Sequence, residues 1–128
     1  MTRVNVGIDP EEMENDILLA EHREIKRIPN CIKNGRFNLN GIPERFTLGE
    51  GHVKFFYRKI GYLKERYQKI HKVCLNRELN VQDFSESFEG IDDYFMGNYI
   101  ETQRDRELLL KRFAERGHIL RKVDNEKK

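Results

Sequence analysis

The chain has 128 residues, of which 38% are hydrophobic and 36% charged. This length and balance predict one domain, residues 1–128, with a single core of moderate size. The net charge of +2 does not by itself indicate a nucleic-acid partner, and no apolar run approaches the roughly 18 residues that a membrane span needs.

The first predicted helix covers residues 10–28, with a bend near Pro29 and a continuation to Lys33. Asp9 suits the N-cap, Pro10 suits the first helical position, and the acidic residues that follow favour the helix dipole. At about 100° per residue, one arc of this helix forms the core face. Its members are Ile17, Ile25 and Ile28, with Leu18 at the edge and Glu21 inside for no reason visible in the sequence.

An irregular connection is expected over residues 33–51, where Gly and Pro recur. A second helix begins near His52. Apolar residues then recur at alternating steps of four and three, which predicts one buried seam. The seam comprises Phe56, Ile60, Leu63, Tyr67, Ile70 and Cys74.

Residues 80–99 have weak periodicity and predict a loop with a short helical turn. Thr102 and Asp105 form a capping sequence for a third helix, which Gly117 ends. We expect a polar, frayed tail over residues 122–128. No convincing strand occurs, so the predicted fold is a compact all-α domain of three main helices with long loops. The apolar side of the third helix comprises Leu108, Leu109, Leu110 and Phe113.

Charge is unevenly distributed along the chain. Residues 54–77 carry eight basic side chains and one acidic one, whereas residues 83–93 carry five acidic side chains and no basic one. This pattern fits a protein with one side facing an anion, or equally a helix with a basic outer face.

Cys31 and Cys74 are expected to be reduced thiols, and no Cys or His spacing predicts a metal site.

One stripe of the first helix combines Arg23, Glu24 and Arg27 with Ala20. Such a stripe is either a solvated face with Glu–Arg pairs, or a phosphate clamp that holds an acid/base group. The helical positions of these residues alone leave both interpretations open.

Three segments occur in order: MTRVN at residues 1–5, AEHRE at 20–24 and FTLGEGHVKFFY at 46–57. In these segments the chain resembles the pyrimidine-dimer DNA glycosylase/AP lyases of the phage endonuclease V type. The resemblance implies the same all-α architecture, with an N-terminal arm threading between helices. Weaker similarity continues through residues 74–75, 79–83 and 95–100.

The resemblance also implies an imine mechanism. The small side chain of Thr2 permits removal of Met1, which leaves an α-amine with an unperturbed pKa near 7.7–8.0. By resemblance this amine attacks the sugar C1′ of the damaged nucleotide, and β-elimination breaks the strand on the 3′ side. By the same resemblance, Glu24 is expected to stabilise positive charge on the sugar and to transfer protons during the elimination. No metal or organic cofactor is expected.

The resemblance supplies Arg3, Arg23, Arg27 and His52 as DNA-binding candidates. His22, which stands where the family's best-known member has Tyr, is a further candidate. A bidentate guanidinium suits phosphate. The expected partner is double-stranded damaged DNA, bound by a monomer that is cytoplasmic and DNA-associated, without membrane contact.

Two alternatives stay open. The family commonly ends in Trp and Tyr residues near the lesion, and this chain has no Trp. It would then be a glycosylase or lyase for abasic or other modified-base DNA without dimer specificity. A non-catalytic helical DNA-binding module would use the same arginines. Glu24 argues against that module, because a carboxylate among phosphate-binding groups repels DNA.

Overall fold

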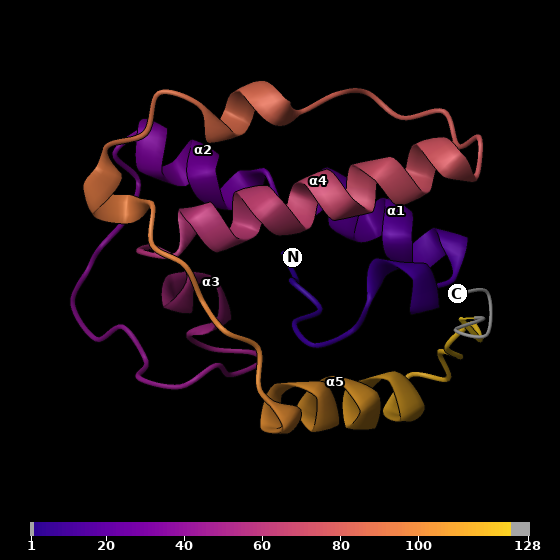
Figure 1. Ribbon diagram of the computed structural model, residues 1–128. Helices are drawn as coiled ribbons and strands as arrows, with labels where there is room; N and C mark the ends of the chain where they lie inside the picture. Colours follow the sequence, from indigo (N-terminus) through magenta and orange to yellow (C-terminus); the bar gives the residue numbers. More distant parts are fainter. Residues whose placement is uncertain (1, 124–128) are drawn as a thin grey trace.

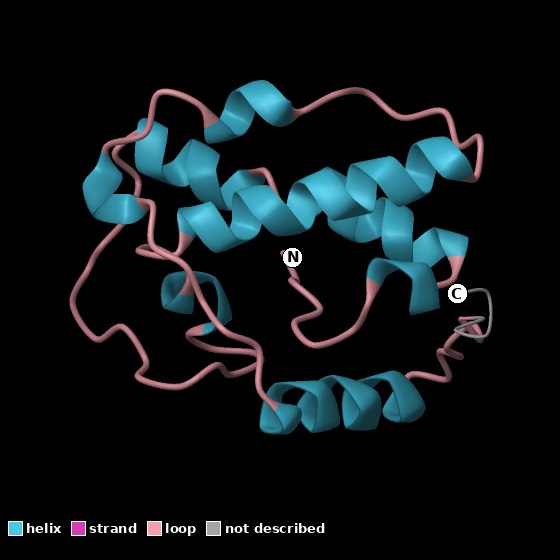
Figure 2. Ribbon diagram, viewed as in Figure 1, coloured by secondary structure: helices cyan, strands magenta, loops and turns pink. Residues whose placement is uncertain are grey.

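The computed structural model describes residues 2–123. Over that range the chain is helical, and extended pairing is limited to an isolated bridge between Lys59 and Met96 (Figure 2). The all-α prediction is therefore confirmed. In chain order, with η for 3₁₀ turns, the elements are η1 (Pro10–Glu12), α1 (Asn15–Glu24), α2 (Arg27–Lys33), α3 (His52–Phe55), α4 (Ile60–Asn76), η2 (Ser85–Phe88), η3 (Asp93–Phe95) and α5 (Gln103–Glu115).

The helices lie on two sides of the N-terminal arm. α1 packs along α4, and η2 packs against both α4 and α2. α5 lies across the arm from this group (Figure 1). No helix within residues 2–123 has the length and apolar character needed to cross a bilayer.

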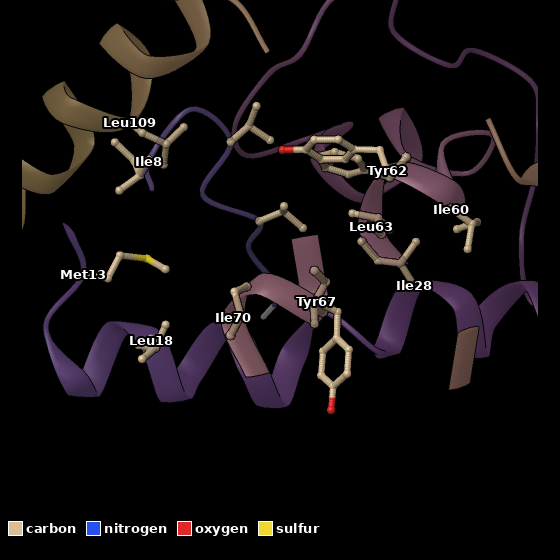
Figure 3. Packing of buried hydrophobic residues seen from close by; sticks show 14 of the residues in the cluster. Ile8, Met13, Leu18, Ile28, Ile60, Tyr62, Leu63, Tyr67, Ile70 and Leu109 are labelled. Carbon is tan, nitrogen blue, oxygen red and sulfur yellow. The ribbon is translucent and has the colours of Figure 1, made fainter. Parts of the chain in front are cut away.

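The arm itself is part of the core. Val4, Val6 and Ile8 are at most 1% exposed, and Ile8 lies next to Leu109 of α5 (Figure 3). Burying side chains of this size stabilises the fold by about 1.5–3 kcal/mol each. Gly7, at φ +85°, lies so close to α5 that a Cβ would come within 2.9 Å of the Arg106 backbone. The arm therefore threads between helices, as the resemblance implied.

The prediction of one helix over residues 10–28 is wrong, because the segment forms η1, α1 and α2 separately. The second break falls at Ile25 and Lys26, where the chain turns before α2 resumes. Pro29 lacks an N–H to donate to the Ile25 carbonyl, and its ring excludes regular helix at that carbonyl. The helix therefore breaks four residues before the proline, and Pro29 itself lies inside the first turn of α2.

The second predicted helix is also divided, into α3 and α4. At the division, Gly97 lies against the Arg58 carbonyl, and its own carbonyl accepts from Tyr62 N–H over 3.1 Å in the first turn of α4. This contact satisfies a donor that a helix start leaves free. The buried seam is confirmed: Phe56, Ile60, Leu63, Tyr67, Ile70 and Cys74 are all at most 1% exposed.

α5 begins and ends where the sequence predicts. Thr102 and Asp105 form a reciprocal capping box. After the helix, Gly117 at φ +70° lets the N–H of His118 donate to the Phe113 carbonyl over 2.9 Å.

The predicted loop with a short helical turn over residues 80–99 is also confirmed. Of the predicted frayed tail, residues 124–128 lie outside the described part of the chain.

Candidate functional site

The arm meets the end of α1 at Glu24. The backbone N–H of Arg3 donates to Glu24 Oε1 over 3.3 Å, and Arg23 Nη2 lies 3.6 Å from Glu24 Oε2. The Glu24 side chain is 17% exposed, so it is reachable but shielded from bulk water. Half-buried Thr2 directly precedes Arg3. The structure thus brings together Thr2, Arg3, Arg23 and Glu24.

A hollow of about 170 Å³ opens beside this carboxylate. It forms where the arm, α1 and the C-terminal end of α5 meet. Its walls include Phe113, Arg116 and His118 as well as Arg3 and Glu24. A small part of a substrate therefore has space directly beside the Glu24 carboxylate.

Two arginines near this site were not predicted from the sequence: Arg112 of α5 and Arg116, the C-cap residue of that helix. Burial lowers the pKa of Arg3; the charges of Arg112 and Arg116 lower it further, and Glu24 opposes the change. The two arginines therefore lie close to the arm. Their i, i+4 spacing was a signal for a shared basic face, but the sequence did not show that this face meets the arm.

Arg27 lies on α2, beyond the break at Ile25 and Lys26, and is exposed. A single stripe on one continuous helix is therefore wrong. Arg27 nevertheless stays near Arg23, because burial lowers the pKa of Lys26 and both arginines lower it further. The basic surface around the end of α1 is retained across the break.

His52 links the arm to the loop before α3. Its Nε2 accepts from Val4 N–H over 2.9 Å, and its Nδ1 lies 2.8 Å from the Thr47 carbonyl. The two contacts fix a neutral ring with the proton on Nδ1. Burial lowers the pKa of His52, although the bond to Thr47 opposes this. The ring is 4% exposed, so His52 positions the arm and presents no open surface to DNA.

His22 lies outside the hollow. Its ring is 2% exposed, and its Nε2 is 3.0 Å from His71 Nδ1 in a cluster that includes Phe84. Burial, reinforced by His71 and Lys26 and opposed by Asp83, lowers the pKa of His22 to about 4. Burial against His71 gives His22 a structural role that does not require DNA. We therefore do not include His22 in the proposed DNA-binding surface.

The His22 environment predicts acid sensitivity. The unfolded chain protonates His22 below pH about 6.5, whereas the native protein does so near pH 4. The unfolded state binds more protons in this window, so the unfolding free energy should fall as pH drops from about 6.5 to about 4. Urea unfolding across that range should give His22→Leu a slope up to about 1.4 kcal/mol per pH unit shallower than wild type.

Wild-type protein measured in the same buffers is the reference for this series. A slope for His22→Leu equal to the wild-type slope would contradict the prediction and show that folding does not lower the pKa of His22.

The unexplained Glu21 has a structural role. Its Oε2 accepts from Arg66 Nε over 2.5 Å, and its Oε1 accepts from Arg66 Nη2 over 3.0 Å and from Asn5 Nδ2 over 2.7 Å. The pair is buried, with side chains 0% and 4% exposed for Glu21 and Arg66. Arg66 was predicted among the basic residues that face an anion outside; it instead ties α4 to α1 and to the arm.

In the described residues, no group of His, Cys, Asp and Glu side chains is arranged to hold a metal ion. Cys31 and Cys74 are free thiols. What the hollow does offer is the Glu24 carboxylate, with the buried Glu21 behind it, and the guanidinium groups of Arg3 and Arg116. This set suits proton transfer beside a bound polyanion.

A comparison with protein-family models agrees with this chemistry. The model described as "Pyrimidine dimer DNA glycosylase" matches residues 1–87, about two thirds of the chain. The match includes the arm, Glu24 and His52, and ends before α5.

Proposed function

Because the chain belongs to the pyrimidine dimer DNA glycosylase family, it is a DNA repair glycosylase, and we propose that it is also an AP lyase. In this proposal the α-amine of Thr2, freed by removal of Met1, is the nucleophile. An amine near its ordinary pKa is partly neutral at pH 7, unlike a lysine.

The observation that supports this proposal best is the hydrogen bond from Arg3 N–H to Glu24 Oε1, at 3.3 Å. The Thr2 carbonyl carbon and Cα alone separate that nitrogen from the Thr2 amine. This contact supports a position for the amine near the Glu24 carboxylate, which lines the hollow. Position next to the reacting group supplies much of the catalytic advantage.

In the proposed sequence, the amine lone pair forms a bond to C1′ as the damaged base leaves with the glycosidic electrons. A proton then passes from this nitrogen to O4′ as the C1′–O4′ bond breaks, and the nitrogen lone pair forms the C=N bond of a protonated imine. Glu24 then removes a C2′ proton; these electrons form a C=C bond as the C3′–O bond breaks and the 3′ phosphate departs. Water finally hydrolyses the imine and restores the amine.

The guanidinium groups around the hollow would hold the DNA backbone. Arg3, Arg23 and Arg27 come from the arm, α1 and α2, while Arg112 and Arg116 come from α5 and its C-cap. Their charge would also offset the repulsion between Glu24 and the phosphates. His52 would act indirectly, by holding the arm at Val4.

Borohydride trapping tests the nucleophile. Borohydride reduces an imine to a stable amine, so incubation with DNA that contains an abasic site should give a protein–DNA adduct that survives denaturation. Tryptic mass spectrometry should place the DNA on the peptide that begins at Thr2. Protein with an acetylated N-terminus is the control, and it should give no adduct.

The strongest competing amine is Lys26. Burial and the neighbouring arginines lower its pKa, and its Nζ donates to the Arg23 carbonyl over 2.7 Å near the site. An adduct on Lys26 would overturn the N-terminal mechanism and keep the lyase activity. No adduct at all, with DNA binding intact, would remove the lyase proposal.

A further inference from the structure

A second hollow, of about 310 Å³, lies between α5 and the loop before α3. Its α5 wall consists of residues at i, i+4, i+7, i+8 and i+11, which share one helix face. Thr47 and Leu48 form the loop wall. The α5 residues are Arg104, Leu108, Lys111, Arg112 and Glu115.

We propose that this hollow is a seat for the DNA strand that flanks the lesion, with Lys111 as its phosphate contact. The proposal rests on the proposed function, because it extends the same DNA across α5. The α5 wall of this hollow, with Lys111, lies beyond the matched range 1–87, whereas the loop wall of Thr47 and Leu48 lies within it.

Charge is the first support. Three of the wall residues are cations, Arg104, Lys111 and Arg112, against Glu115 as the one anion. Glu115 lies 3.7 Å from Arg112 Nε, and Arg104 Nη1 donates to the Phe46 carbonyl over 2.8 Å. Lys111 is exposed. Its ammonium is therefore the main phosphate contact of this hollow, since Arg104 and Arg112 already contact Phe46 and Glu115.

Continuity with the catalytic hollow is the second support. Arg112 belongs to the wall of the second hollow and lowers the pKa of Arg3 at the first. A strand that leaves Glu24 across Arg112 therefore arrives at Lys111. From Arg104 to Glu115 the stripe is about 16 Å long at 1.5 Å per residue. At a rise of about 3.4 Å per nucleotide along the duplex axis, this length spans four or five nucleotides of one strand.

The same seat is connected to the nucleophile. Thr47 lines it, and the Thr47 carbonyl bonds to the His52 ring that holds Val4 of the arm. A strand in this seat would therefore lie against the loop that fixes the arm, so the flanking DNA and the reacting nucleotide would be held in one register.

Salt titration of Lys111→Ala tests the seat. The probe is a duplex of about 25 base pairs with an uncleavable tetrahydrofuran abasic analogue, and anisotropy is followed at several NaCl concentrations. Losing one phosphate contact should reduce the slope of log K against log[salt] by about 0.9, and should weaken binding about tenfold at 50 mM salt. Lys111→Arg should restore the wild-type slope.

Lys72→Ala is the matched control, because it removes the same charge from an exposed position on α4 that lines a different hollow. That hollow also includes Arg106, which projects from the other side of α5 relative to Leu108 and Glu115. Lys72→Ala should keep the wild-type slope. Equal slopes for Lys111→Ala and wild type would overturn the seat. Absence of binding and of a trapped adduct in the wild-type protein would overturn the proposed function instead.

Discussion

Arg66→Met is expected to lower the unfolding free energy by about 3–5 kcal/mol, measured by urea unfolding at pH 7. The substitution leaves the Glu21 carboxylate buried without its cation, since that side chain is 0% exposed and Arg66 supplies two of its hydrogen bonds. An uncompensated charge at such a site costs far more than the packing that methionine keeps.

The double variant Glu21→Leu/Arg66→Met is the control for this prediction. Replacing both members of a buried ion pair by apolar groups is often neutral or stabilising. Here Asn5 Nδ2 would lose its acceptor on Glu21, which costs about 1–3 kcal/mol. The double variant should therefore be more stable than Arg66→Met alone. A loss below about 1 kcal/mol for the single variant would show that water or a neighbouring cation reaches Glu21.

Local patterns in the sequence predicted the helices well where each helix sets its own boundary. Thr102 with Asp105 caps α5, Gly117 ends it, and a 3.6-residue period defines the seam of α4. The breaks were harder to predict. The division before α4 depends on Gly97, far along the chain. The position of the break before Pro29 depends on the steric contact between the proline ring and the carbonyl of Ile25, four residues earlier.

The interior charges show the limit of a helical wheel. Glu21 can lie on the core face of α1 because Arg66 of α4 forms an ion pair with it there. The two residues are 45 positions apart in the chain. A wheel of either helix alone shows a misplaced carboxylate or one more basic residue. Pairing across helices can be seen only when α1 and α4 are placed together.

Some features of the candidate site could likewise be predicted from the sequence, whereas others depend on tertiary packing. The N-terminal arm and α1 are close in sequence, and the family resemblance predicted that both contribute to the site. The structure brings the Arg3 N–H to 3.3 Å from Glu24 Oε1. Arg112 and Arg116 approach the arm through tertiary packing alone. His22 and His52 are polar in sequence yet buried in the fold, since each finds hydrogen-bonding partners inside.

Glu24→Gln is expected to reduce strand cleavage at an abasic site by at least about 100-fold, the contribution of a positioned acid/base group. Glutamine keeps the size of the side chain and an oxygen that accepts from Arg3 N–H, but it cannot take the C2′ proton. DNA affinity should be equal or higher, because a negative charge near the phosphates is removed. Single-turnover cleavage and fluorescence anisotropy measure the two effects separately.

Glu14→Gln provides the matched control. It removes the same charge from an exposed residue at the opposite end of α1, where the side chain makes no capping hydrogen bond. It should leave cleavage near the wild-type rate. Cleavage by Glu24→Gln within about threefold of wild type would exclude Glu24 as the proton acceptor, since even a modest general base contributes more than this. Equal losses in both variants would instead indicate a general effect of charge on DNA binding, and the anisotropy data would show it directly.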